Sequence, residues 1–184
     1  GKTWLIWHLG YFCRQQRVPV FQFNFDDGIP WDYFAILSEA RRNLGDDHPF
    51  RKLEEMVSKT VTPTDDVGRR FNEQLLSDVF FDCLRQMASQ RMVVFLFDTL
   101  EKAPDDARTW LRSQLLGTIR NGQLTGVVVI AAGRSTLALD DNWDSTVAHT
   151  ALDVFKAPDV ERYFVKRGKQ EWLTRPGFVA DIIK

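Results

Sequence analysis

The sequence has few of the residues from which metal centres and disulfide frameworks are built. It contains two cysteines, Cys13 and Cys83, and three histidines, none in the His-Glu-x-x-His or paired-cysteine spacing of a zinc site. Both cysteines lie in amphipathic stretches, where a free cysteine usually behaves as a small buried hydrophobic residue. We therefore expect no disulfide, no resident transition metal, and a reducing, cytoplasmic setting.

An excess of one charge and long apolar runs are also lacking. The 24 basic residues nearly balance the 25 acidic ones, so the composition does not indicate a nucleic-acid or anionic-membrane partner. No apolar run approaches the roughly 20 residues that span a bilayer. With 184 residues, of which 44% are hydrophobic, the chain instead has the length and composition of one ordinary globular domain.

The sequence is organised around the apolar segment 92–97, which ends on Asp98. Because this segment shows no polar alternation, it is typical of a strand buried on both faces of a parallel sheet. A carboxylate at the carboxyl end of such a strand lies where open α/β sheets bind ligands. Taken alone, Asp98 is also compatible with a buried strand that simply reaches the surface there.

Helical and strand patterns alternate along the rest of the chain. Strands are predicted at 18–25, 92–97, 125–132 and 150–155, and helices at 4–16, 31–44, 51–59, 66–90, 105–120, 158–167 and 176–184. This alternation predicts βαβ units and a mainly parallel sheet, with 18–25 near an edge because Gln22 and Asn24 make one of its faces polar. The first helix is apolar around most of its circumference, so we expect its aromatic side chains in the core. Asp26 and Asp27 are interpreted as turn and capping groups.

Gly1-Lys2-Thr3 is the last third of the phosphate-binding pattern G-x-x-x-x-G-K-[ST], and the helix that the pattern requires follows it. In that pattern, backbone N–H groups at the helix N-terminus bind phosphate oxygens, the lysine adds a positive charge, and the hydroxyl ligates Mg²⁺. The triplet alone would occur by chance in roughly one in ten chains of this size. Its position upstream of the strand ending at Asp98 matches the order of a Walker A lysine and a Walker B aspartate.

The chain therefore resembles the P-loop NTPases of the AAA-like and STAND groups. The resemblance rests on Gly1-Lys2-Thr3, on Phe-Leu-Phe-Asp-Thr-Leu-Glu at 95–101, and on Val-Val-Val-Ile-Ala-Ala-Gly-Arg at 127–134. It implies a three-layer α/β/α fold with a mainly parallel central sheet, an NTPase core at 1–157 and the start of a helical lid at 158–184. The earlier glycines and the strand before them are not in the sequence, so we expect a chain truncated within the Walker A loop that binds ATP weakly by itself.

The resemblance also implies roles for individual residues. Gly1, Lys2, Thr3 and Asp98 would bind ATP, with Thr3 and Asp98 also holding Mg²⁺. Arg134 would contact the γ-phosphate, and Glu101 would polarise the attacking water, although it lies three positions after Asp98 where many relatives have the acid immediately next to the aspartate. Two alternatives stay open, namely that Glu101 is a helix N-terminal carboxylate and that Arg134 forms a structural ion pair.

The function implied is an ATP-binding, slowly hydrolysing switch domain of a multidomain signalling or regulatory protein. Its partners would be attached effector and sensor domains, with a nucleotide-dependent homo-oligomer also compatible, and neither a membrane nor nucleic acid is expected. The alternative is a degenerate P-loop module that acts as a non-catalytic scaffold. The preference for ATP or GTP, the activating signal and the retention of hydrolysis stay open.

Overall fold

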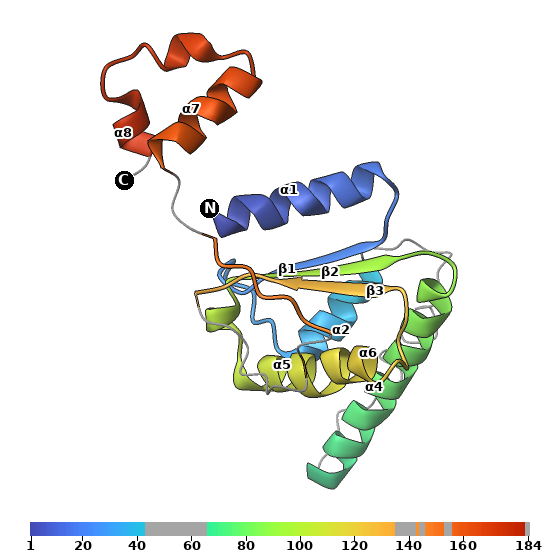
Figure 1. The fold of residues 1–184 in the computed structure, drawn as a ribbon. Helices are drawn as coiled ribbons and strands as arrows, with labels where there is room; N and C mark the ends of the chain where they lie inside the picture. Colours follow the sequence, from blue (N-terminus) through green and yellow to red (C-terminus); the bar gives the residue numbers. More distant parts are fainter. Residues whose placement is uncertain (43–65, 135–142, 144–145, 153–155, 183–184) are drawn as a thin grey trace. The chain divides into compact units, whose positions relative to one another are not determined.

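A computed structural model describes residues 1–42, 66–134, 143, 146–152 and 156–182 (Figure 1). The chain divides into two compact units, Lys2–Val147 and Ala148–Lys184, the second grouped with Gly1. The boundary expected between residues 157 and 158 stays a prediction. The helix predicted at 51–59, and the last two residues of the one predicted at 31–44, lie outside the described residues.

The larger unit is built on a three-stranded parallel sheet in the order β1 (Val20–Asn24), β2 (Val93–Asp98), β3 (Val127–Ala131). The register pairs Asn24 with Asp98 and Phe97 with Ala131, so all three strands end at the same edge. This confirms the predicted α/β class and the parallel pairing of these strands. The strand predicted at 150–155 is wrong for 150–152, which have no strand partner among the described residues, and 153–155 lie outside them.

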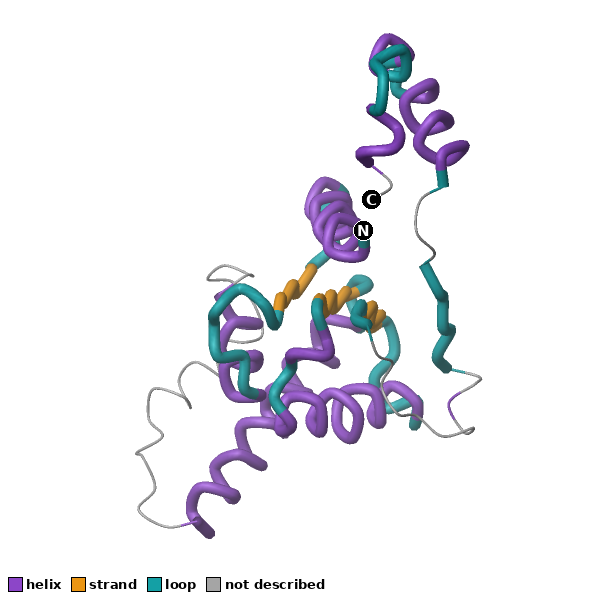
Figure 2. Tube along the Cα trace, turned by 90° about the vertical axis from the view of Figure 1, so that its left-hand side faces the viewer, coloured by secondary structure: helices purple, strands orange, loops and turns teal. Residues whose placement is uncertain are grey.

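One face of the sheet packs against most of the helices. These are α2 (Tyr33–Arg42), α4 (Asp66–Ala88), α5 (Asp105–Trp110) and its continuation through a π-helical segment (η2, Leu111–Leu116) into α6 (Gly117–Arg120). Figure 2 views the strands nearly end-on, with α1 on one side and these helices on the other. Five phenylalanines have no exposed surface in this interior: Phe21, Phe23, Phe80, Phe95 and Phe97. Rings of adjacent strands pack against each other here, with centroids 4.7 Å apart and planes tilted by 30° for Phe21 and Phe95, and 5.3 Å apart and stacked for Phe23 and Phe97.

The other face is covered by one helix, α1 (Lys2–Gln15). Ile6 packs with Val94 and Leu96 of β2, which alternate with the phenylalanines of that strand and therefore point to the opposite side. Gly10 permits this close packing, because a Cβ there would overlap the side-chain oxygen of Gln22. The helix is thus held by a narrow strip of small and aliphatic contacts.

The aromatic residues of α1 contradict the sequence-based prediction of their burial. Trp4, Trp7, Tyr11 and Phe12 are 51%, 57%, 49% and 56% exposed. The reason is that α1 meets the sheet through its two buried residues, Ile6 and Gly10, with half-buried Leu9 and Cys13 beside them, and no described element of the larger unit covers its outer side. Apolar residues around most of the circumference of α1 predict burial on every side of the helix, but only the side that faces the sheet is buried.

The smaller unit is helical. It contains α7 (Ala157–Lys166), a short 3₁₀ segment (η4, Gln170–Trp172) and α8 (Phe178–Ile182). Phe178 packs between Phe164, at 5.0 Å between ring centroids, and Trp172, at 5.7 Å. The two helices predicted here are confirmed over the described residues. Within those residues, no helix of either unit combines the length and apolar character needed to cross a bilayer.

Candidate functional site

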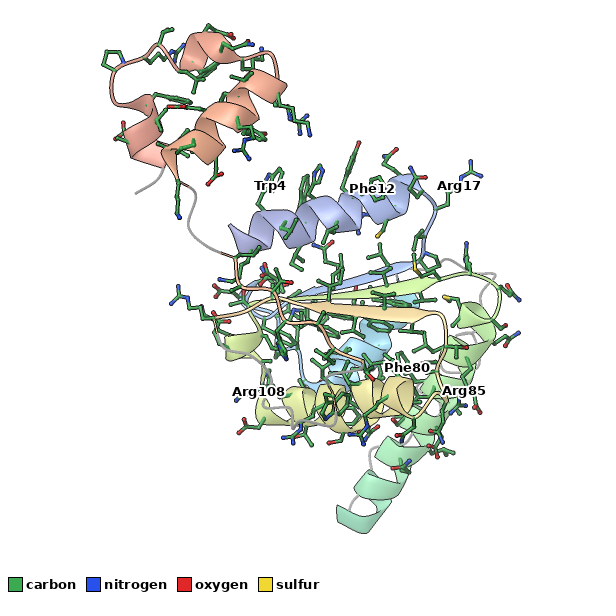
Figure 3. The ribbon with its side chains drawn as sticks, in the orientation of Figure 1. Trp4, Phe12, Arg17, Phe80, Arg85 and Arg108 are labelled. Atoms are coloured by element: carbon green, nitrogen blue, oxygen red, sulfur yellow. The ribbon has the colours of Figure 1, made fainter. Side chains whose placement is uncertain are left out.

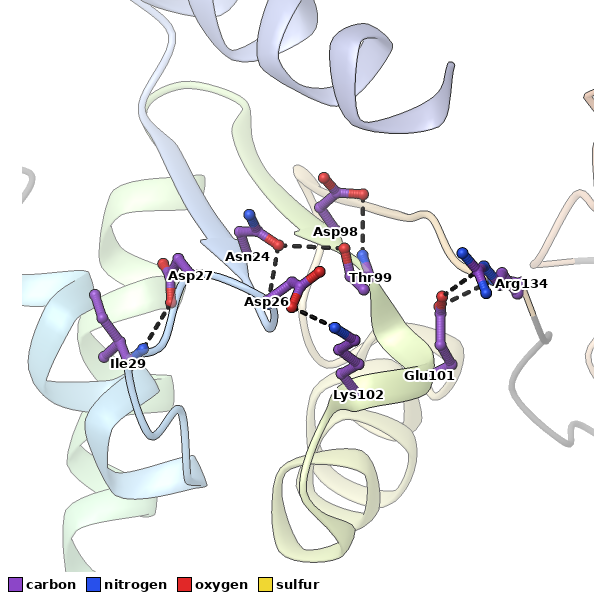
Figure 4. A network of polar contacts seen from close by, with 9 residues as sticks. All are labelled: Asn24, Asp26, Asp27, Ile29, Asp98, Thr99, Glu101, Lys102 and Arg134. Carbon is purple, nitrogen blue, oxygen red and sulfur yellow. Dashed lines mark hydrogen bonds and ion pairs between the residues drawn. The ribbon is translucent and has the colours of Figure 1, made fainter. Parts of the chain in front are cut away.

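Asp98 is the last residue of β2 and is almost completely buried, with 4% of its surface exposed. Because side chains alternate along a strand, it shares the α1 side of the sheet with Val94 and Leu96. Figure 4 shows its carboxylate directed to that side. Asp98 Oδ1 accepts a hydrogen bond of 2.9 Å from the backbone N–H of Thr99, which offsets part of the cost of burying the carboxylate.

Thr99 has a strained backbone conformation directly after Asp98. Its φ of 58° and ψ of 45° are left-handed, which is unfavourable for a β-branched residue. Its hydroxyl donates a hydrogen bond of 3.2 Å to Oδ1 of Asn24, the register partner of Asp98 on β1. The turn lets the 3₁₀ segment η1 (Leu100–Lys102) begin at the sheet edge, and backbone strain of this kind is concentrated at functional sites.

Glu101 and Arg134 are in contact, although they are far apart in the sequence. The backbone N–H of Arg134 donates to Glu101 Oε2 at 2.9 Å, and its Nε lies 3.6 Å from Oε1 (Figure 4). This backbone hydrogen bond, followed by the positive charges of Arg134 and Lys2, holds the pKa of Glu101 below its ordinary value. Glu101 is therefore an ionised carboxylate engaged by Arg134, whose side chain is 91% exposed.

The close approach of β3 to Glu101 depends on Gly133. A Cβ at this position would lie 2.8 Å from Glu101 Oε2 and 3.1 Å from Leu100 Cβ. The adjacent backbone is fixed by a hydrogen bond of 3.0 Å from the N–H of Leu100 to the carbonyl of Ala132. The Gly-Arg pair at the end of the third strand therefore has a packing reason, which is to let Arg134 reach the carboxylate.

Lys2 and Thr3 form the first turn of α1, whose N-terminal end lies at the edge where the strands end (Figure 1). Lys2 is close enough for its charge to act on Glu101. Unpaired backbone N–H groups and a lysine at a helix N-terminus attract anions. In the described part of the chain no hydrogen bond joins Lys2 or Thr3 to Asp98, and Gly1 precedes the helix.

A second polar cluster at the same edge is structural. The carboxylate of Asp26 pairs with the ammonium of Lys102. Asp27 Oδ1 accepts hydrogen bonds of 2.9 Å from the backbone N–H of Ile29 and from Trp31 Nε1. These contacts confirm the interpretation of Asp26-Asp27 as turn residues. Sequence reasoning missed Asn24 as a site residue, because its place on the polar side of the first strand was interpreted only as a sign of a sheet edge.

The oxygen donors at this edge suit magnesium better than a transition metal. Mg²⁺ in nucleotide sites is usually held by one or two protein oxygens together with phosphates and waters, and Thr3 and Asp98 supply a hydroxyl and a carboxylate of that kind. Across the described residues, no group of three or more His, Cys, Asp or Glu side chains could hold a metal by itself. Thr3 and Asp98 would therefore need phosphate oxygens and waters to complete a magnesium site.

A scan against protein-family models found no match, and searches of curated proteins and of solved structures also found none. The geometry itself establishes a parallel α/β unit. It has a buried carboxylate, an ion pair and a lysine-bearing helix N-terminus at the carboxyl edge of its sheet.

Proposed function

We propose that this edge of the sheet binds ATP with Mg²⁺, and that the chain is the nucleotide-dependent switch domain of a P-loop-type NTPase in a signalling or regulatory protein. The observation that carries the proposal is that the N-terminal end of α1, with Lys2 and Thr3, lies at the edge and on the side of the sheet to which buried Asp98 points. Phosphoryl transfer requires this combination of a phosphate cradle and a magnesium carboxylate.

Each proposed role follows from the chemistry of one group. Lys2 neutralises charge on the β- and γ-phosphates, and Thr3 and Asp98 hold Mg²⁺ directly or through water. The guanidinium of Arg134 is exposed, so it is able to turn from Glu101 toward the γ-phosphate. The strained turn at Thr99 fixes the direction in which the chain leaves Asp98 and supports a functional role for this edge.

The Glu101–Arg134 pair suggests how binding and hydrolysis are coupled in this proposal. A γ-phosphate competes with Glu101 for the Arg134 guanidinium, because both are anions. Phosphate binding then takes the guanidinium away from Glu101 Oε1, and this oxygen becomes free to orient the attacking water while the Arg134 backbone N–H still holds Oε2. As long as Arg134 stays in contact, the lowered pKa of Glu101 makes its carboxylate a weaker base, so this contact keeps hydrolysis slow.

A non-catalytic scaffold is the second candidate, and one observation favours it. Glu101, the carboxylate proposed to polarise water, already accepts two contacts from Arg134. If these contacts persist with nucleotide bound, the edge has no free carboxylate for water, and the module acts only through binding or packing.

Calorimetric titration of the 184-residue chain with Mg-ATP tests the proposal. We expect saturable binding that weakens by at least about tenfold in Lys2→Ala, since one charge-assisted hydrogen bond is worth about that much. Lys102→Ala is the matched control, because this lysine pairs with Asp26 at the same edge. GTP in competition reports the base preference.

Binding is expected to be weak, because Gly1-Lys2-Thr3 supplies only the last third of the phosphate-binding pattern. Binding that is unchanged in Lys2→Ala would remove this lysine from the proposed site. If neither Mg-ATP nor Mg-GTP binds saturably, the switch is ruled out and the scaffold is favoured.

A further inference from the structure

The outer side of α1 is a continuous aromatic surface without a partner in its own unit. We call Trp4, Trp7, His8, Tyr11 and Phe12 the α1 aromatic face; all five are exposed. Figure 3 shows Trp4 and Phe12 projecting away from the sheet. Single exposed apolar residues are common, but several large rings on adjacent turns of one helix are typical of an interaction site.

The rings of this face are ordered by stacking on one another. Trp4 and His8 stack with centroids 4.9 Å apart and planes 7° apart, and Trp7 stacks on Tyr11 at 6.3 Å and 12°. Such pairs one turn apart form a ridge, the shape that packs into the groove of another helix. Because these rings are already ordered, docking costs less side-chain entropy.

The same stacking argues against a nucleobase platform. A base needs an open ring face on which to stack. Trp4 and His8 present their facing surfaces to each other, so those surfaces are not accessible to a base.

The charge around the face indicates the chemistry of the partner. The first acidic residue of the chain is Asp26, so α1 and the residues after it carry cations without carboxylates. Arg14 and Arg17 are exposed at the C-terminal end of the face, and neither is in an ion pair with another described residue. Arg14 instead donates a hydrogen bond of 3.1 Å to Gln22. A partner with carboxylates beside its apolar side complements this end.

Two other occupants fit this charge pattern less well. A second copy docked through the same face brings the cations of both copies together without a carboxylate to pair with them. A membrane-surface helix usually carries cations along its polar side, whereas here Arg14 and Arg17 lie at one end of the face.

We propose that the α1 aromatic face docks an amphipathic acidic helix of a partner protein. The leucine-like side chains of that helix lie against the ridge formed by Trp4, Trp7 and Tyr11, and its carboxylates lie beside Arg14 and Arg17. This is helix–helix recognition, in which the ridge of α1 packs into a groove on the surface of the partner helix. The proposal does not depend on nucleotide binding, because its apolar contacts use the side of α1 that faces away from the sheet, and Arg14 lies at the flank of the helix, where it reaches Gln22 of β1.

The experiment uses the full 184-residue chain and a synthetic three-heptad peptide with leucine at positions a and d and glutamate at the flanking positions. Anisotropy of the labelled peptide measures binding. We expect saturable binding that weakens by at least about tenfold in Trp4→Ala/Trp7→Ala, as for hot-spot aromatic residues. Tyr163→Ala is the matched control, because Tyr163 is a similarly exposed aromatic residue, at 47%, in the other unit.

A charge exchange separates recognition from folding. Arg14→Glu/Arg17→Glu should lose the glutamate peptide and gain the otherwise identical lysine peptide, and a variant that had merely unfolded would bind neither specifically. Circular dichroism checks that each variant keeps its helices.

Four results would overturn the proposal. These are no saturable binding of the glutamate peptide, equal binding of the lysine peptide to the unmodified chain, binding unaffected by Trp4→Ala/Trp7→Ala, or a tighter Trp4- and Trp7-dependent interaction with another occupant. The other occupants tested are phosphatidylserine vesicles, oligo-dT, and a second copy of the chain followed by sedimentation.

Discussion

The two faces of the sheet are built from the same three strands, yet they differ in composition and covering. The face toward α2, α4 and α5 is aromatic and sealed, with Phe95 and Phe97 of β2 completely buried. The face toward α1 has an aliphatic cluster around Ile6 and Leu96 and, at its carboxyl end, Asn24 and Asp98. Because consecutive strand residues point to opposite faces, one strand supplies both environments.

The difference teaches how this unit separates stability from chemistry. Burial of phenylalanine rings supplies most of the favourable free energy on the sealed face. On the α1 face, a thinner covering leaves room for a buried carboxylate, an ion pair and a helix N-terminus at the edge. Four predictions test this division, beginning with the largest expected effect.

Phe95→Ala should lower the free energy of unfolding by about 3–5 kcal/mol, because it removes a fully buried ring and leaves a cavity. Trp7→Ala, which removes a larger ring from the outer side of α1, should change it by no more than about 0.5 kcal/mol. Urea unfolding followed by circular dichroism measures both. Equal losses of unfolding free energy in the two variants would mean that the outer side of α1 is covered in solution. The two faces of the sheet would then not differ in how completely they are covered.

Asp98→Ala should reduce ATP hydrolysis by at least about a hundredfold in the nucleotide-binding protein, while affinity for ATP falls much less. The reason is that magnesium placement matters more for the charge of the transition state than for the ground state. Phosphate release and a nucleotide titration measure the two effects. Asp26→Ala, at the same edge, serves as the control. Unchanged turnover in Asp98→Ala would show that Asp98 does not place the magnesium ion.

Gly133→Ala should destabilise the unit by about 1–3 kcal/mol, because its Cβ would overlap the Glu101 carboxylate and crowd Leu100. For Gly117→Ala we expect the opposite effect, an increase in stability. Its Cβ would have no neighbour closer than the Arg112 carbonyl oxygen at 3.8 Å, so it should stabilise the helix by about 0.5–1 kcal/mol. Thermal unfolding of both variants measures these changes in stability. A Gly133→Ala variant as stable as the unmodified chain would show that β3 is free to move away from Glu101.

Glu101→Gln should have the smallest effect, and the effect should depend on pH. The folded-state pKa of Glu101 is below its unfolded value, so the carboxylate contributes stability above the unfolded pKa and loses it as the pH falls through the lower folded pKa. The stability difference between the two proteins should therefore be present at neutral pH and fade in acid.

Urea midpoints across this pH range measure that difference. Arg134→Ala should reproduce only part of it, because the backbone N–H of residue 134 remains as a donor. A difference that stays constant down to the acid limit would show that the Glu101 carboxylate gains nothing from Arg134 in the folded state.

Local patterns in the sequence were sufficient for the main elements. The apolar run ending at Asp98, the helix after Gly1-Lys2-Thr3, and the turn at Asp26-Asp27 depend on residues close together in the chain. Their spacing therefore reports backbone conformation directly. The parallel arrangement also followed, because strands that alternate with helices pair in that way.

The contacts that define the candidate site depended on the tertiary structure. Glu101 contacts Arg134, which lies 33 positions later in the sequence, and Thr99 contacts Asn24, which lies 75 positions earlier. Helical or strand periodicity gives no information about contacts between residues so far apart in the sequence. The tertiary structure also decided the exposure of Trp4 and Trp7, since a sequence shows which side chains are apolar but not whether a second layer packs over them. The sequence by itself determined most of the helices and the three strands of the sheet, and where the carboxylate lies on its strand, although it also predicted a strand at 150–152 that does not form. The packing of strands and helices decided which polar groups meet, because pairing and burial are properties of neighbours in space.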